Sequence, residues 1–358
     1  MHPALQTPLV DLLGSRYPIV QTGMGWVAGP KLVSATSNAG AFGIIASATM
    51  TYDELAAAVA ETKARTSAPF GVNMRADADD IMDRCKLLVR EGIPVASFAQ
   101  APKKDLIEYL HDHGVKVMPS IGAKRHAEKV MEWGVDAILV QGGEGGGHTG
   151  AVPTSLLLPE VVDVVGGRVP VVAAGGYFDG RGLVSALAYG ASGIAMGTRF
   201  LLTSDSAVPM EVKKAYLGTG VTGTIVTTKI DGAPHRVIVT DLVKQMDGAS
   251  AITATPKAIA NASKFRKYTG LSWLQMLREG RDMKKRMDLS WAEVIMAGNT
   301  PILTKATLVD GQLDAGILPT GQVVGVIDDL PSADEVVARI VAEAESTLDR
   351  LAGRVPGS

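Results

Sequence analysis

The residues from Gln141 to Gly150 have the types and spacing that catalysis at a bound cofactor would need. Six of these ten residues are glycines, and His148 stands among them. The stretch follows an apolar run, 136–140, that is typical of a buried strand. Glycines at a strand end let the backbone approach a flat or charged group, and an imidazole titrates near neutral pH. We therefore expect a cofactor-binding loop with His148 as the catalytic base. A surface loop with a chance histidine is the alternative.

Glu144, in the same loop, either orients His148 or caps a strand, and we favour the structural role.

Polar residues and glycines also follow several other predicted strands. Asn73 and Gln141 carry amide groups, which donate and accept hydrogen bonds and therefore suit the edge of a heterocyclic ring. The pairs Gly175-Gly176 and Gly197-Thr198 follow the last two strands, where barrels bind phosphate through backbone N–H groups. Any one of these turns alone would be read as an ordinary turn. Because they occur together, we expect one site for a planar, phosphate-bearing cofactor.

These residues follow short apolar runs that alternate with helical segments. The predicted strands are 18–21, 43–46, 70–73, 95–98, 115–118, 136–140, 169–174 and 193–196. Continuous apolar runs are typical of parallel strands covered on both faces, and eight such units close a barrel. The sequence therefore predicts an α/β fold, a (β/α)8 TIM barrel. An open doubly wound sheet is the second choice.

The chain after the barrel has a different pattern. Residues 203–330 are predicted to form a mixed, mainly helical cap, with a strand pair at 223–228 and 235–239 and a helix at 264–297. A terminal helix is predicted at 332–351. We thus expect three parts: 1–202 as the cofactor-binding barrel, 203–330 as the cap and substrate region, and 331–358 as a helix that packs back on the barrel.

The composition limits the classes of function. Of 358 residues, 46% are hydrophobic, and the formal net charge of −2 favours neither nucleic acid nor an acidic membrane as a partner. No basic and apolar leader begins the chain, and no apolar run reaches the ~18 residues of a membrane span, so we expect a cytoplasmic protein. The single cysteine, Cys85, excludes an intramolecular disulfide and a multi-cysteine metal site, and we expect no metal.

Several motifs match one family in kind, spacing and order: Gln21-Thr-Gly-Met-Gly25, Phe70-Gly-Val-Asn73, Val140-Gln141 through His148-Thr-Gly150, Ala173-Ala-Gly-Gly176 and Ala195-Met-Gly-Thr-Arg199. Over about residues 8–205 the chain resembles the nitronate monooxygenase (2-nitropropane dioxygenase) superfamily of FMN-dependent barrels, which includes flavin-dependent enoyl-acyl-carrier-protein reductases. The resemblance implies FMN as the cofactor and His148 as the base.

By the same resemblance, Met24, Asn73 and Gln141 would contact the flavin ring. Its phosphate would be held by Gly175, Gly176, Gly197 and Thr198. The full set of expected cofactor-binding residues is Gly23, Met24, Gly25, Asn73, Gln141, Gly142, Gly146, Gly147, Gly175, Gly176, Gly197 and Thr198.

A closer resemblance extends through the cap. The phrases Met24-Gly-Trp-Val-Ala-Gly29 and Gly232-Ala-Pro-His-Arg-Val237, with 198–206 and the tail 299–330, resemble a branch found in steroid-degrading bacteria. That branch contains a flavin-dependent dehydrogenase, or desaturase, of a hydroxylated methyl-hydroindanone carboxyl-CoA thioester from steroid rings C and D. The resemblance implies oxidation of an acyl-CoA after loss of its α-proton. The alternatives are a nitronate monooxygenase that uses O2, an enoyl-thioester reductase, and a barrel that binds a flavin or phosphate ligand without catalysis.

A CoA thioester carries phosphates, which need cations to bind them. The predicted helix at 264–297 offers a basic run that includes Lys284, Lys285 and Arg286. We expect these three residues, together with Arg75 and His235, to contact the substrate, and a solvated helical face is the alternative. The sequence leaves open the electron acceptor and whether the protein forms a homodimer.

Overall fold

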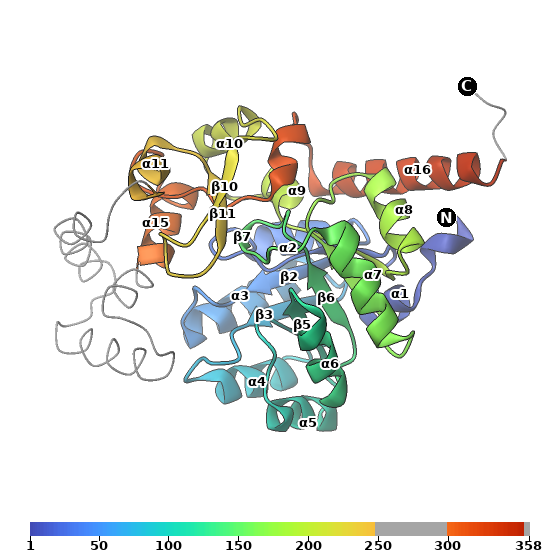
Figure 1. Ribbon diagram of the computed structural model, residues 1–358. Coiled ribbons are helices and arrows are strands. Elements are labelled where there is room, and N and C mark those ends of the chain that lie inside the picture. The colour runs from blue at the N-terminus through green and yellow to red at the C-terminus, as the bar shows by residue number, and fades with distance from the viewer. Residues whose placement is uncertain (248–298, 354–358) are drawn as a thin grey trace.

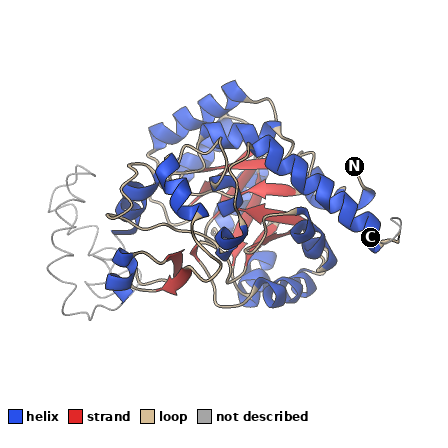
Figure 2. Cartoon of the chain, turned by 90° about the horizontal axis from the view of Figure 1, so that it is seen from above, coloured by secondary structure: helices blue, strands red, loops and turns tan. Residues whose placement is uncertain are grey.

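The computed structural model describes residues 1–247 and 299–353. Parallel strands close into a barrel, with the last strand pairing back on the first through Ile194 and Ile19, and Figure 2 shows the strands surrounded by helices. The strands are β1 (Ile19–Gln21), β2 (Phe42–Ala46), β3 (Phe70–Met74), β4 (Val95–Phe98), β5 (Lys116–Ile121), β6 (Ile138–Gln141), β8 (Val171–Ala174) and β9 (Gly193–Met196). The closed barrel confirms the predicted TIM fold and excludes the open doubly wound sheet.

One end of the barrel is closed by the short helix α1 (Pro8–Leu13). Its residues Leu9 and Leu13 belong to the same buried cluster as strand residues such as Val20 and Phe42. A Cβ added at Gly193, the first residue of β9, would lie 2.6 Å from Leu9 Cδ2. The helix therefore sits where the strands begin, and it leaves the carboxyl ends of the strands for the functional site.

Helices connect the strands on the outside of the barrel (Figure 1). They are α2 (Pro30–Asn38), α3 (Tyr52–Arg65), α4 (Ile81–Arg90), α5 (Lys104–Asp112), α6 (Lys124–Glu132), α7 (Thr154–Val165), α8 (Gly180–Ala188) and the short α9 (Thr198–Leu201). A capping box between Thr51 and Glu54 begins α3. Gly166 ends α7 with a left-handed φ of 58°, which favours glycine at a helix terminus.

A second, smaller sheet is built from the glycine loop and the segment after the barrel (Figure 1). Its order is β10 (Thr224–Thr227), β11 (His235–Ile238) and β7 (Gly147–His148), all antiparallel. The predicted strand pair is confirmed, whereas the pairing of the glycine loop with it was not predicted. Around this sheet lie α10 (Met210–Leu217), α11 (Asp241–Asp247), α15 (Asn299–Leu308) and η2 (Gln322–Val326). The helix predicted at 264–297 lies outside the described residues.

The terminal helix α16 (Ala333–Leu351) packs along the outside of the barrel beside α8 (Figure 1). A capping box between Ser332 and Glu335 begins it. The N–H of Gly180 donates to Glu343 Oε2 over 2.8 Å, and a side chain at Gly180 would collide with the backbone of α16. Within the described part of the chain, no helix is both long and apolar enough to cross a membrane.

Candidate active site

A cavity of about 430 Å³ opens at the carboxyl ends of the barrel strands. Its volume lies within the range of ligand pockets in proteins. Most of the residues that the sequence singled out line it: Gly23, Met24, Gly25, Asn73, Gln141, Gly146, Gly147, His148, Gly175, Gly176, Gly197, Thr198 and His235. The fold thus brings together side chains and backbone from several different strand ends.

Other predicted site residues do not line the cavity. Gly142 packs against the start of α7, where a side chain would collide with Thr154. The guanidinium of Arg75 instead pairs with Asp77 at the surface, with Nη2 and Oδ2 2.7 Å apart. Its expected contact with substrate therefore gains no support from the structure. Lys284, Lys285 and Arg286 lie outside the described residues.

The glycines of the loop make room mainly for the protein's own chain. A Cβ at Gly145 would lie 2.5 Å from Gln141 Nε2, and one at Gly146 would collide with the backbone of Thr320 and Gly321. These glycines are therefore needed for the fit of the loop to the protein's own chain, which was not predicted. Their contact with a cofactor stays a prediction. Gly175 and Gly176 differ, because their φ values of 92° and 89° require left-handed backbone beside the cavity.

Hydrogen bonds from two sides hold the glycine loop. Gln141 Nε2 donates to the carbonyl of His148 over 2.8 Å, which folds the loop back on its own strand. From the cap, Arg236 Nη2 donates to the carbonyl of Gly143 over 2.8 Å, and the N–H of Thr149 donates to the carbonyl of Pro234 over 3.1 Å. The position of His148 therefore depends on the cap as well as on the barrel.

Glu144 caps a helix and does not contact His148. Its Oε2 accepts hydrogen bonds from the N–H of Thr154 over 2.9 Å and from Thr154 Oγ1 over 2.7 Å, at the first residue of α7. A carboxylate at a helix N-terminus satisfies open backbone donors and interacts favourably with the helix dipole. Its role is thus structural, at a helix where the sequence suggested a strand.

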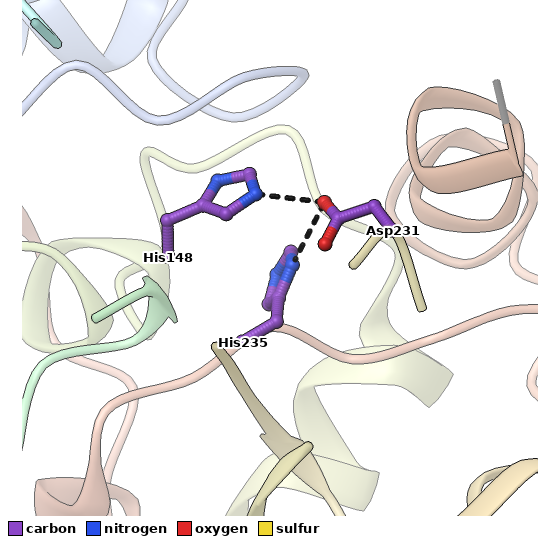
Figure 3. A group of neighbouring side chains, drawn as sticks. All are labelled: His148, Asp231 and His235. Carbon is purple, nitrogen blue, oxygen red and sulfur yellow. Dashed lines mark hydrogen bonds and ion pairs between the residues drawn. The ribbon is translucent and has the colours of Figure 1, made fainter. Parts of the chain in front are cut away.

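Figure 3 shows three neighbouring side chains, His148, Asp231 and His235, and both histidines line the cavity. His148 Nε2 lies 2.7 Å from Asp231 Oδ2, and His235 Nδ1 lies 3.6 Å from the same oxygen. The two imidazole rings are 4.7 Å apart between centroids and tilted by 44°. The side chain of His148 is 62% exposed, while those of Asp231 and His235 are 8% and 4% exposed.

Burial alone would raise the pKa of Asp231, but the neighbouring imidazoles outweigh it. Their interactions with the carboxylate hold the pKa of Asp231 well below its usual range. Two further donors support the carboxylate, Thr300 Oγ1 at 3.1 Å from Oδ2 and the N–H of Ala233 at 3.2 Å from Oδ1. Asp231 is therefore an anion at neutral pH.

The same three residues could each offer one ligand atom to a metal ion, and these atoms lie within 4.8 Å of one another. Two ligand atoms on one tetrahedral Zn²⁺, each ~2.1 Å from the ion, would be roughly 3.4 Å apart. The 2.7 Å between His148 Nε2 and Asp231 Oδ2 is shorter than that and matches a charge-assisted hydrogen bond. The arrangement is therefore that of a hydrogen-bonded histidine–aspartate pair with a second histidine beside it.

Several lining residues were missed by the sequence interpretation. They come from the segment after the barrel: Thr300, Pro301, Thr304, Leu308, Pro319, Thr320, Gly321 and Val323. The N–H of Gly321 donates to Thr198 Oγ1 over 2.9 Å, which joins this segment to the end of β9. The signals available in the sequence were the Pro319-Thr-Gly321 turn and the Asp231 that precedes His235 by four residues.

The cavity suits a planar cofactor with a terminal phosphate. The left-handed Gly175-Gly176 turn and the start of α9 at Thr198 offer backbone near one part of it, and the amide of Asn73 lies at another strand end. Trp26 also lines the cavity, and its buried Nε1 donor finds no hydrogen-bond partner among the described residues. A bound ligand with an acceptor atom would satisfy this donor.

The model of the family described as nitronate monooxygenase matches residues 6–343, nearly the whole chain. The chain belongs to the nitronate monooxygenase family. Members of this flavin-dependent family share the barrel described above, and the structure of FabK from Thermotoga maritima superposes with a TM-score of 0.79 at 30% identity, covering 98% of this chain and 99% of that one.

Two bacterial relatives are more similar in sequence, and both are named (3aS,4S,5R,7aS)-5-hydroxy-7a-methyl-1-oxo-octahydro-1H-indene-4-carboxyl-CoA dehydrogenase. The relative from Mycobacterium tuberculosis is 58% identical to this chain. The match covers 95% of this chain and 96% of the relative. The one from Rhodococcus jostii is 56% identical over 97% of this chain and 98% of its own length. The similarity therefore spans the cap as well as the barrel.

Proposed function

We propose that the protein is an FMN-dependent dehydrogenase that desaturates a hydroxylated hydroindane carboxyl-CoA thioester from steroid ring C/D degradation. The observation that carries this proposal is the 58% identity to a dehydrogenase of such a thioester along 95% of the chain. That extent includes the segment after the barrel, whose residues form one wall of the cavity. Relatives with this level of identity along nearly the whole chain support the same substrate class.

The residues at the cavity have defined tasks in this proposal. The thioester carbonyl acidifies the proton on its α-carbon, and His148, which lines the cavity, would accept that proton as general base. FMN, when bound, supplies the two-electron acceptor that desaturation needs. Gly175, Gly176, Gly197 and Thr198 would hold its phosphate, and Met24, Asn73 and Gln141 would lie against its ring.

Oxidation of a nitronate with O2 is the second candidate, and the family match favours it. A nitronate is already deprotonated, so His148 would act as a base only if the parent nitroalkane were the substrate and lost the proton next to its nitro group. An enoyl-thioester reductase is a third and weaker one, because it would run the flavin chemistry toward a saturated product. Neither alternative accounts for the similarity of the cap to the two CoA-ester dehydrogenases.

The test is anaerobic mixing of the purified yellow holoprotein with the hydroxy-hydroindane carboxyl-CoA ester. We expect rapid loss of the oxidised-flavin absorbance and a product lighter by two hydrogens in mass spectrometry. The flavin released from the protein should be FMN at about one per chain. Oxygen uptake with an alkyl nitronate, together with an unreacted CoA ester, would contradict the dehydrogenase and support the monooxygenase. FAD or no flavin would contradict the assignment of the cavity.

A further inference from the structure

The hydrogen bond between His148 and Asp231 joins the barrel's glycine loop to a residue 83 positions away in the cap. We propose that Asp231 is a positioning residue that holds the Nε2–H tautomer of His148, so that Nδ1 is the atom that accepts the substrate proton. The inference rests on the proposed function, because it assigns the atom and the partner of that same base. It adds a cap residue to a reaction that the family motifs place on the barrel alone.

The tautomer follows from the chemistry of the pair. An ionised carboxylate can only accept hydrogen bonds, and Asp231 is ionised at neutral pH. The imidazole nitrogen 2.7 Å from its Oδ2 must therefore carry the hydrogen, and that nitrogen is Nε2. In a neutral imidazole with Nε2–H, the lone pair is on Nδ1. A hydrogen bond at one ring nitrogen thus selects the other as the base.

Asp231 is itself held in place, which is what positioning requires. It belongs to the turn that connects β10 and β11, and its oxygens accept from the N–H of Ala233 and the hydroxyl of Thr300. The carboxylate side chain is 8% exposed, so bulk water screens its charge weakly. The imidazolium that forms when His148 accepts the proton would be stabilised by this charge, while Asp231 stays unprotonated.

His235 is the second residue that holds the His148 ring in place. It pairs with His148 across the β11–β7 ladder, and its buried ring lies against the His148 ring. Neither of its ring nitrogens makes a hydrogen bond to another described residue, although Nδ1 faces Asp231 at 3.6 Å. Among the described residues, Asp231 and His235 are the titratable side chains that contact His148. Its contact limits rotation of the base, so His235 supports the ring without a direct part in proton transfer.

The proton balance is simple. The α-C–H bond of the substrate breaks, the new N–H bond forms at His148 Nδ1, and the electron pair stays on the substrate as an enolate. Because the His148 side chain is 62% exposed, the proton can pass on to water between turnovers.

The kinetic test is Asp231→Asn, which keeps the size of the side chain and removes its charge. We expect the anaerobic rate of flavin reduction to fall at least tenfold, within the ~10²–10⁴-fold that a positioned general base contributes. FMN content should change little. The melting temperature should fall by a few degrees, because the folded protein holds the pKa of Asp231 low, so the rates are compared well below that temperature.

The matched control is Asp136→Asn. Asp136 makes the same kind of pair on the outside of the barrel, with Oδ2 2.7 Å from His111 Nε2. We expect this variant to keep the wild-type rate. An Asp231→Asn protein with the wild-type rate would overturn the inference while leaving the proposed function intact.

A second measurement does not depend on turnover. The ¹⁵N shifts of the His148 imidazole, assigned by comparison with His148→Gln, report which ring nitrogen carries the hydrogen at neutral pH. We expect the Nε2–H form in the wild type and a loss of this bias in Asp231→Asn. A wild-type Nδ1–H form would overturn the inference. If no CoA thioester reduces the wild-type protein, the proposed function fails, and this measurement still decides the tautomer.

Discussion

His148 is held at one ring nitrogen and exposed at the rest of its side chain. The Asp231 carboxylate anchors Nε2, and 62% of the side-chain surface remains accessible. A base that must collect a proton from substrate and then release it to solvent needs both properties. A fully buried imidazole would favour its neutral form and exchange its proton slowly. The exposed ring beside the cavity therefore suits repeated proton transfer.

Gly146 tests how tightly the glycine loop must fit. A methyl group there would collide with the backbone of Thr320 and Gly321, which also borders the cavity. We expect Gly146→Ala to lower the FMN-to-protein ratio after purification and to reduce the melting temperature by several degrees. Absorbance spectra and thermal denaturation measure the two effects. The control is Gly220→Ala, because a Cβ at Gly220 meets no atom within 4 Å. Equal behaviour of the two variants would contradict the close approach.

Among the residues of the cavity, those at the ends of the barrel strands were predicted from the sequence, whereas those from the cap were missed. Residues such as Asn73 and Gly175 follow apolar strands directly, so strand periodicity places them at the same end of a barrel. Asp231 reaches His148, and Thr320 reaches the cavity, only through contacts between distant parts of the chain. No local pattern encodes such contacts.

Among the elements, α9 and α16 are joined to the segment between them by one carboxylate. Asp329 Oδ1 lies 2.8 Å from Nη1 of Arg199 in α9, and its Oδ2 contacts Nη1 of Arg339 in α16 at 2.5 Å. Burial alone would raise the pKa of Asp329, but hydrogen bonds from Arg339 and Arg199 outweigh it and lower this pKa. Because the folded-state pKa is depressed, the stabilisation is present above the unfolded value of about 3.9 and is lost as pH falls below it.

We therefore expect Asp329→Asn to lower the melting temperature by a few degrees at pH 7 and by less near pH 3. Thermal denaturation of both proteins across this range measures the gap. Asp83→Asn, which removes an exposed pair with Lys86, is the control and should change little at any pH. A gap that stays constant down to pH 3 would show that the carboxylate's charge contributes nothing to stability.

Helices and strands that bury an apolar face could be predicted from the sequence. The barrel strands are continuous apolar runs, and α16 begins at a capping box, so both were predictable. The short β7 was not, because Gly147 and His148 have no strand-forming pattern. It exists because β11 offers a partner edge, which is a property of the folded cap.

For the whole molecule, the cavity is shared between the barrel and the segment that follows it. We propose that residues 203–330 act as the substrate region over the cofactor-binding barrel 1–202, with 331–358 as a helix on the barrel's outside. Thr300 and Thr320 support this division, because both line the cavity from the cap side. The contact of Lys284, Lys285 and Arg286 with CoA phosphates stays a prediction, as does a homodimer.

The central claim is that His148 is the base of an FMN-dependent oxidation of an acyl-CoA. Stopped-flow reduction of the bound flavin by the CoA ester under nitrogen, for wild type and His148→Ala across pH, tests it most directly. The account predicts that the variant keeps its FMN and visible spectrum and reduces its flavin about 10²–10⁴-fold more slowly. Flavin reduction in His148→Ala at the wild-type rate would contradict the account.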